Sequence, residues 1–249
     1  MRPSAICSRI IIFYFFFISH SGWAQTISSQ KGLTTAVFNL PQGNIKVYLP
    51  DDIRPGDVIS GTVLAEPAGT TDKEKNRNSQ SLQQYKVKLG DIIISSVSLQ
   101  RQKIKFIQSP VYSSIELLDD KAVIISTMPV QVNNTPFIQP GNISAPSHVL
   151  ANSPLRITGP FDGDASNTQC RIEGKEMEVI AESPRQTICS MPSTTSGPHT
   201  VTIEEKGKIT ETKISAVNMD LAAGKLNLMK GQKTYVDVTI TGLQNLPSN

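Results

Sequence analysis

The sequence is poor in the side chains that most enzyme active sites use. Its 249 residues include three histidines, three cysteines and one tryptophan, and aromatic residues make up 6% of the chain. It has no Gly-x-Ser-x-Gly nucleophile motif, no His-Glu-x-x-His zinc motif and no glycine-rich phosphate-binding loop. So few histidines leave little capacity for general base chemistry near neutral pH. We therefore expect a protein that is not an enzyme, with no catalytic residues and no cofactor.

Adjacent carboxylates are the remaining candidates for catalysis. Asp51 with Asp52, and Asp119 with Asp120, could formally serve glycoside hydrolysis, which uses a pair of carboxyl groups. Both pairs fall in expected turns, where neighbouring acids are usually solvated. The scarcity of aromatic rings also argues against a face on which sugars or unpaired bases stack.

The beginning of the chain has the parts of a secretory signal peptide. Basic Arg2 and Arg9 precede the apolar run Ile10–Ile18, and Gly22-Trp23-Ala24 forms a small-x-small cleavage site. The apolar run is too short to cross a bilayer. We expect residues 1–24 to be removed. The protein is then exported to the periplasm, the cell surface or the medium, with no membrane span after cleavage.

Removal of this leader leaves a nearly neutral chain. The formal net charge falls from +3 to +1, because two basic residues and no acidic residue are lost. Such a balance provides no general attraction to nucleic acid or to an anionic membrane. The expected partner is a protein or glycan ligand at the cell envelope, and no nucleic acid.

Short runs of alternating apolar and polar residues predict an all-β protein. They recur about every ten residues between turn residues, which is typical of tandem antiparallel, immunoglobulin-like β-sandwiches. We expect a flexible N-terminus at residues 25–36 and a first sandwich module at 37–131. One short helix is expected there, because Thr71-Asp72-Lys73-Glu74 fits a capping box. The polar segment that follows, to about Gln84, is a short solvated helix or a loop.

Two later segments differ in composition from their surroundings. Residues 132–152 are rich in proline, which cannot donate to a β-ladder, and we expect a stiff linker there. Residues 217–249 continue a set of strand signals at 215–221, 226–228 and 234–241, and we expect an incomplete third β-module. Unpaired strand edges invite a partner strand, so a further domain or a neighbouring chain would complete it.

A middle module is expected at residues 153–216. It contains the segments Leu155–Gly163, Cys170–Gly174 and Gly197–Ile203, with turns at glycine and β-branched strands between them. Through these segments, residues 153–205 resemble the IPT/TIG family of immunoglobulin-like domains. The resemblance implies a fold and names no ligand. The family includes cell-surface receptors and DNA-binding transcription factors, and the leader excludes the latter.

Cys170 and Cys189 are the two cysteines that remain after export. Both lie in expected strands of the middle module. In an oxidising compartment an isolated pair in one small domain is usually bonded, which predicts a Cys170–Cys189 disulfide. Two buried free thiols are the alternative.

A loop in the same module has oxygen ligands at calcium-loop spacing. Asp162, Asp164, Ser166 and Glu173 occupy positions 1, 3, 5 and 12 of a possible EF-hand loop. Position 6 is Asn167 where glycine is required, and the flanking segments are expected strands, not helices. A solvated turn is the preferred interpretation, and no metal site is expected.

These observations favour an exported, noncatalytic protein of immunoglobulin-like modules. It would serve as a spacer, in adhesion or in protein–protein contact at the cell surface or in the periplasm. Two alternatives remain open: a carbohydrate-binding accessory region of a larger secreted polysaccharide-active enzyme, and a structural subunit of an envelope assembly that exchanges C-terminal strands. Its binding chemistry is expected in loops such as Asp51–Asp57 and Asp162–Thr168, or outside this chain.

Overall fold

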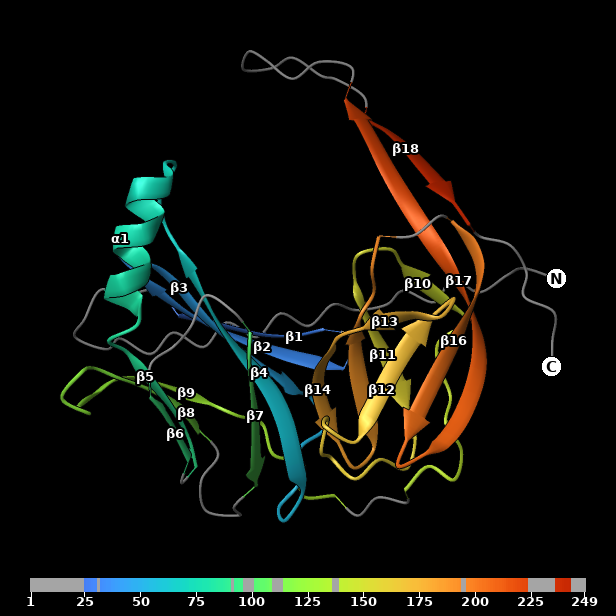
Figure 1. Ribbon diagram of the computed structural model, residues 1–249, viewed down its shortest axis with the longest axis horizontal. Helices are drawn as coiled ribbons and strands as arrows, with labels where there is room; N and C mark the ends of the chain where they lie inside the picture. Colours follow the sequence, from blue (N-terminus) through green and yellow to red (C-terminus); the bar gives the residue numbers. More distant parts are fainter. Residues whose placement is uncertain are drawn as a thin grey trace, which may run out of the picture.

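The computed structural model (Figure 1) describes residues 25–30, 32–90, 92–95, 101–108, 114–135, 139–193, 196–223 and 236–242. The expected leader therefore lies outside the described residues. Strands dominate the described ranges, in agreement with the predicted all-β class, and they group into two sandwiches. The one helix in these ranges, α1 (Asp72–Leu82), has 11 residues, and nothing helical there is long and apolar enough to span a bilayer.

The first sandwich consists of two facing sheets. One has the order β1-β2-β3-β4 with β7 on the far edge of β4, and the other has the order β6-β5-β8-β9. The strands are β1 (Gln25–Gln30), β2 (Leu33–Leu40), β3 (Gly43–Pro50), β4 (Val58–Pro67), β5 (Lys86–Leu89), β6 (Ile92–Ser95), β7 (Gln102–Ile107), β8 (Ser114–Leu118) and β9 (Ile124–Pro129). Alternate side chains of these strands form a core that includes Phe38, Ile45, Leu49, Ile59, Leu89, Ile115 and Leu117.

The helix α1 begins where the capping box predicts. The backbone N–H of Glu74 donates to Thr71 Oγ1 at 3.3 Å, and the N–H of Thr71 donates to Glu74 Oε2 at 3.2 Å. These bonds satisfy helix-end donors that would otherwise lack partners. The helix is polar except at its end, where Leu82 enters the core of the first sandwich. The buried Leu82 side chain holds this polar segment as a helix, whereas the sequence had left a helix and a loop as alternatives.

The second sandwich also has two sheets, β11-β15-β14 and β10-β17-β16-β12-β13. Its strands are β10 (His148–Leu150), β11 (Pro154–Thr158), β12 (Thr168–Ile172), β13 (Lys175–Met177), β14 (Val179–Ser183), β15 (Gln186–Ser190), β16 (Gly197–Glu205) and β17 (Lys208–Ala223). Its core contains Leu155, Ile157, Cys170, Ile203 and Ile214. Among the named strands of the described chain, β10 and β17 are the parallel pair, and the other pairs are antiparallel.

Two segments expected to lie outside the modules contribute strands. Gln25–Gln30 pairs as β1 with β2, within the range expected as a flexible N-terminus. Residues 148–150, within the range expected as a linker, pair as β10 with β17. Pro140 and Pro146 precede β10 and the strand itself contains no proline, so its backbone remains free to pair.

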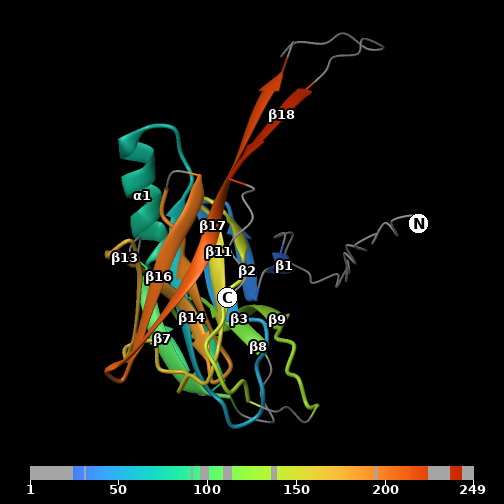
Figure 2. The same ribbon diagram turned by 90° about the vertical axis from the view of Figure 1, so that its right-hand side faces the viewer.

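The C-terminal part of the described chain forms a hairpin that projects from the second sandwich (Figures 1 and 2). Strand β17 continues for 16 residues without a glycine or proline, and so it crosses the expected boundary at residue 216. Its outer half, residues 218–223, pairs with β18 (Val236–Thr241). The strand expected at residues 226–228 lies outside the described residues.

Candidate functional site at the junction of the sandwiches

The two sandwiches meet where β14 of the second lies beside β4 of the first. Glu182 pairs with Ser60 at this point, and the bridge joins both sets of strands into one eight-stranded sheet. A small apolar cluster has members from both sandwiches: Leu33, Ile180, Ala181 and Ile188. We call this contact region the junction.

Arg185 lies in the turn between β14 and β15 and reaches across the junction. Its Nε donates to Asp52 Oδ2 at 2.8 Å, and its Nη1 donates to Asp57 Oδ1 at 3.1 Å. Its Nη2 donates to the backbone carbonyl of Asp52 at 3.0 Å and to Asp57 Oδ2. One loop of the first sandwich thus supplies all of these acceptors. Arg185 is 8% exposed, so this ion-paired group is largely removed from water.

The electrostatics of Arg185 follow from this geometry. Burial lowers the pKa of Arg185, but the hydrogen bonds and charges of Asp57 and Asp52 outweigh burial and raise the pKa above its ordinary value. A bidentate guanidinium–carboxylate contact fixes orientation as well as distance. Loss of either partner would leave an uncompensated charge in a mostly buried place.

The loop that receives Arg185 is held in shape by its own contacts. The backbone N–H of Arg54 donates to Asp57 Oδ2 at 2.9 Å, and Arg54 Nε donates to Asp52 Oδ1 at 3.3 Å. Asp52, for which a solvated position in a turn was expected, instead pairs with Arg185 and Arg54, and Asp57 of the same loop joins that pairing. Their charges are used inside the molecule because an arginine from the other sandwich reaches them.

A second loop, residues 160–167, also packs onto β4 and lies beside the Arg185 turn, where the N–H of Phe161 donates to the carbonyl of Pro184 at 3.1 Å. Ser60 Oγ donates to the carbonyl of Gly163 at 2.7 Å and accepts from the N–H of Ala165 at 3.0 Å. Gly163 has φ of +82°, and a Cβ built there would lie 1.9 Å from the carbonyl oxygen of Val58. Only glycine allows so close a backbone approach. Both loops in which binding chemistry was expected therefore take part in the junction.

Further polar contacts complete the junction. Thr62 Oγ1 donates to the carbonyl of Ile180 at 2.6 Å. Gln186 Nε2 donates to the carbonyl of Gly32 at 3.1 Å and to Asp51 Oδ1 at 3.0 Å. Thr62 and Gln186 are both fully buried. The Thr62 hydroxyl and the Gln186 amide nitrogen are thus paired across the junction, which favours one arrangement of the two sandwiches, whereas Gln186 Oε1 has no partner among the described residues.

The four weak calcium candidates do not converge. Asp164 Oδ2 accepts from Lys105 Nζ at 2.7 Å, and its Oδ1 accepts from Ser166 Oγ at 2.7 Å. Asp162 Oδ2 lies 2.9 Å from Lys206 Nζ. Glu173 lies in the turn beyond the other end of β12, where its Oε1 accepts from the N–H of Thr200. In the described part of the chain no three His, Cys, Asp or Glu side chains are grouped to hold a metal ion.

The lysine contacts explain the electrostatics of this loop. The hydrogen bond from Lys105, with one from Ser166, lowers the pKa of Asp164 to about 2. For Asp162, burial raises the pKa, but hydrogen bonds from Lys206, Asp164 and Asn167 outweigh it and leave the pKa below its ordinary value. Both carboxylates are therefore already neutralised by groups of the chain.

Glu182 is a buried acid that the strand pattern did not single out. Its side chain is fully buried, and neither carboxyl oxygen has a hydrogen bond of ordinary geometry. Burial raises the pKa of Glu182 to about 8; the hydroxyls of Thr168 and Thr187 oppose the change, and the charges of Glu205 and Asp162 add to it. Glu182, which forms the bridge with Ser60, is thus mostly protonated at neutral pH.

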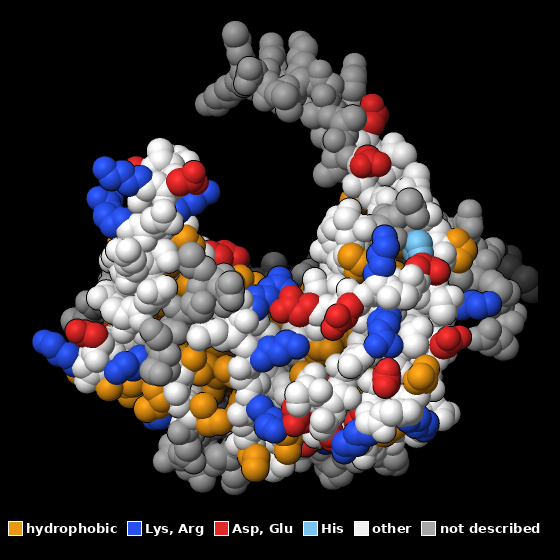
Figure 3. All heavy atoms as spheres, in the orientation of Figure 1, with side chains coloured by type: hydrophobic (Ala, Val, Ile, Leu, Met, Phe, Trp, Pro, Cys, Tyr) orange, Lys and Arg blue, Asp and Glu red, His pale blue; other side chains and the backbone are white. Residues whose placement is uncertain are grey.

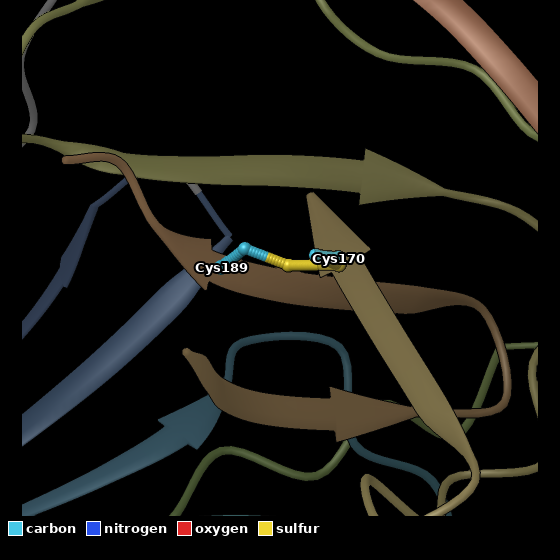
Figure 4. Close-up of a disulfide and its surroundings, with 2 residues drawn as sticks. All are labelled: Cys170 and Cys189. Atoms are coloured by element: carbon cyan, nitrogen blue, oxygen red, sulfur yellow. A yellow bond between two sulfur atoms is a disulfide. The ribbon is translucent and has the colours of Figure 1, made fainter. Parts of the chain in front are cut away.

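Cys170 and Cys189 form a disulfide (Figure 4). Cys170 belongs to β12 and Cys189 to β15, so the bond ties the two sheets of the second sandwich together. Their Cα atoms lie 6.8 Å apart. The structure thus contains the bond that the isolated cysteine pair predicts.

Sequence reasoning missed the residues that make the junction, although one signal was present. Three aspartates between positions 51 and 57 form an acidic loop, and Arg185 stands in a tight turn between two apolar strands. An arginine at such a turn needs a partner if the turn is buried. Ser60 and Glu182 gave no comparable signal, since each looks like an ordinary polar position of a strand.

The comparisons with known proteins agree with the fold of the second sandwich. The IPT/TIG domain family matches residues 142–218. No curated protein sequence matches the chain.

Similar solved structures include three bacterial proteins. A putative phosphatase from Bacteroides thetaiotaomicron is 28% identical over 35% of this chain and 20% of its own, with a TM-score of 0.26. The SGBP-B protein of the Bacteroides ovatus mixed-linkage glucan utilization locus, solved with a heptasaccharide, is 12% identical over 90% and 74%, with a TM-score of 0.27. A β-glycosidase from Bacteroides vulgatus is 12% identical over 69% and 24%, with a TM-score of 0.21.

This chain thus spans a fifth of the length of the phosphatase, and TM-scores this low carry no argument about activity. The family match is of a different kind, because the matched residues 142–218 contain the strands of the second sandwich from β10 to the first part of β17. It also begins at residue 142, so it takes in β10. Residues 142–218 are an IPT/TIG domain, which the resemblance in residues 153–205 predicted.

Proposed function

We propose that the chain is an exported, noncatalytic pair of immunoglobulin-like sandwiches that acts as a rigid spacer and contact element at the cell envelope. The observation that carries this proposal is the buried Arg185 with its two aspartates. It fixes the second sandwich on the first at a set angle. A spacer needs that property, whereas two modules joined only by a chain segment would not have it.

Rigidity at a joint has to be built, because relative motion is the usual state of neighbouring domains. Here three kinds of contact act together: a sheet that crosses the junction, an apolar cluster and buried polar pairs. The Ser60 contacts with Gly163 and Ala165 and the Arg185 contacts with Asp57 attach neighbouring loops of the second sandwich to the first. Together these contacts restrict both bending and twisting at the junction.

Two features support export. The expected leader directs secretion. The Cys170–Cys189 disulfide is stable in an oxidising compartment and is rare in the cytosol. The proposed ligands are proteins or glycans of the envelope.

The proposal is tested by the distance distribution between two spin labels, one on each sandwich. Asn76→Cys on α1 and Glu176→Cys on β13 place labels at exposed positions. For an otherwise unchanged chain we expect one narrow distance. A broad distribution, like that of flexibly linked domains, would show that the chain is no rigid spacer.

The same labelled chain can test whether Arg185 holds the two sandwiches in place. Arg185→Met keeps the length of the side chain and removes its charge, and we expect it to broaden the distribution. The free energy of unfolding should fall by about 3–5 kcal/mol, because this is the usual cost of removing one partner of a buried ion pair. Arg171→Met is the matched control, because Arg171 pairs with Glu204 at the surface and lies away from the junction. An Arg185→Met distribution as narrow as the control would contradict the assigned role.

A further inference from the structure

The outer half of the β17–β18 hairpin has one apolar face. Met219 pairs with Ile240, and Val238 lies two residues from Ile240 on the same face. Met219, Val238 and Ile240 are 45%, 52% and 46% exposed. Asp237 and Thr239 alternate with them and point the other way. An isolated two-stranded hairpin is only marginally stable in water, so this face requires a cover.

A complementary surface lies in the first sandwich, at the edge strand β7. Within the described ranges β7 pairs with β4, and no strand pairs with the other edge of β7. Beside the C-terminal end of β7 is a groove of about 680 Å³, lined by apolar side chains such as Ile92, Phe106 and Ile107 and by the charged Lys105, Asp162 and Asp164. Figure 3 shows hydrophobic side chains gathered on this part of the surface, over β5 to β7. We call it the β7 groove.

The two strands have matching patterns of side chains. On β7, Ile104 and Phe106 face inward, whereas Lys103 and Lys105 face outward and are exposed. On β18, Val238 and Ile240 share one face, and the exposed Asp237 belongs to the other. If β18 extends the sheet beside β7, the apolar faces of both strands coincide. The aspartate then lies on the side of Lys103, whose charge is complementary; Lys105 on that side already pairs with Asp164.

In Figures 1 and 2, β18 lies at the upper outer end of the hairpin and β7 lies low in the first sandwich, so we take the two surfaces to meet between two copies of the chain. We propose that the β18 edge of one copy adds to the β7 edge of a second copy, with its apolar face over the β7 groove. Addition of a strand to an exposed sheet edge is a common mode of recognition. Because the two surfaces differ, the contact is heterologous and generates rings or open chains of copies.

This inference rests on the proposed contact function, for which it names a second copy as the partner. The test is sedimentation velocity of the whole chain over a range of concentrations. We expect the sedimentation coefficient to rise with concentration. A chain that stays monomeric but keeps a narrow label distance would overturn the self-association and leave the rigid spacer intact.

Variants on each surface make the test specific. Val238→Asp alters the hairpin, and Ile92→Asp alters the groove; we expect each to raise the dissociation constant roughly tenfold or more. Ile209→Asp is the matched control, because Ile209 is 60% exposed and lies on β17 away from both surfaces. Circular dichroism and melting curves show whether each variant is folded.

Mixing the two variants distinguishes the possible geometries. The Val238→Asp chain keeps its groove, and the Ile92→Asp chain keeps its hairpin. A mixture should therefore form dimers of one chain of each kind, and nothing larger, because the two remaining surfaces are both altered. Association that Val238→Asp abolishes and Ile92→Asp leaves unchanged would mean that hairpins pack on each other, which would overturn the groove assignment. In a further check, Lys103→Glu combined with Asp237→Lys in one chain should associate better than either single variant.

Discussion

At the scale of single residues, the junction depends on buried polar side chains that occupy ordinary strand and turn positions. Arg185, Thr62 and Gln186 each have their partner on the other sandwich. Their partners are distant in sequence, so no local pattern reveals the pairing. The apolar alternation of β14 and β15 predicts two strands and is silent about which polar residues are buried between sandwiches.

Glu182 gives the first residue-scale prediction. Its pKa in the folded chain is about 8, above the ordinary value of 4.5. The folded state therefore holds a proton that the unfolded state has lost between these two pH values. We expect the stabilising effect of the neutral carboxyl to be complete below about pH 4.5 and to be lost as the pH rises to about 8. The loss is on the order of 4 kcal/mol.

The variant Glu182→Gln checks this prediction, because an amide of the same shape does not titrate. Urea unfolding at several pH values should show that the substitution removes most of the decline in stability between pH 5 and 8. Glu176→Gln is the control, since Glu176 is exposed on β13. If wild type and Glu182→Gln lose stability in parallel over that range, another group is responsible.

Gly163 gives the second residue-scale prediction. Gly163→Ala should destabilise the chain by on the order of 1–3 kcal/mol, because the new methyl group meets the Val58 carbonyl and the backbone has positive φ. Gly174→Ala separates these causes: Gly174 has φ of +76° with nothing within 4 Å of a Cβ there. Melting temperatures should fall more for Gly163→Ala. Equal losses would mean that contact with β4 contributes little.

At the scale of elements, local signals predicted much of the fold. The capping box at Thr71 and Glu74 marks the start of α1, and alternation marks β3, β4 and β12. Boundaries set by composition were less informative. Prolines around β10 suggested a linker, although pairing with β17 depends only on the three residues His148 to Leu150. A strand whose partner lies far along the chain cannot be recognised from its own short sequence.

The Cys170–Cys189 bond gives an element-scale prediction. It closes a loop between β12 and β15, with a sequence separation of 19. Replacement of both cysteines by alanine should cost about 3 kcal/mol in the chain-entropy model. Thiol alkylation of the unreduced, denatured chain should label neither cysteine. Labelling of both would support two free thiols in their place.

At the scale of the whole molecule, the decisive feature is that one sheet serves both sandwiches. The bridge between Glu182 and Ser60 joins a strand of each sandwich, and the cluster around Ile180 lies between the two cores with members from both sandwiches. Neither core can lose its strands at this edge without exposing part of the other. Tandem sandwiches were predictable from strand spacing, but their fusion was not, because it requires one strand of each to lie side by side.

This fusion predicts that the two sandwiches unfold together. In urea, hydrogen exchange measured on peptides from β8 in the first sandwich and β16 in the second should give one shared midpoint. Arg185→Met should separate the midpoints, because the remaining contacts leave each core to its own stability, whereas Arg171→Met should not. Two midpoints in the unchanged chain would mean that the junction orients the sandwiches without coupling their stability. The rigidity of the junction would then depend on local hydrogen bonds such as those of Ser60. In that case Ser60→Ala should broaden the distance distribution between the two spin labels.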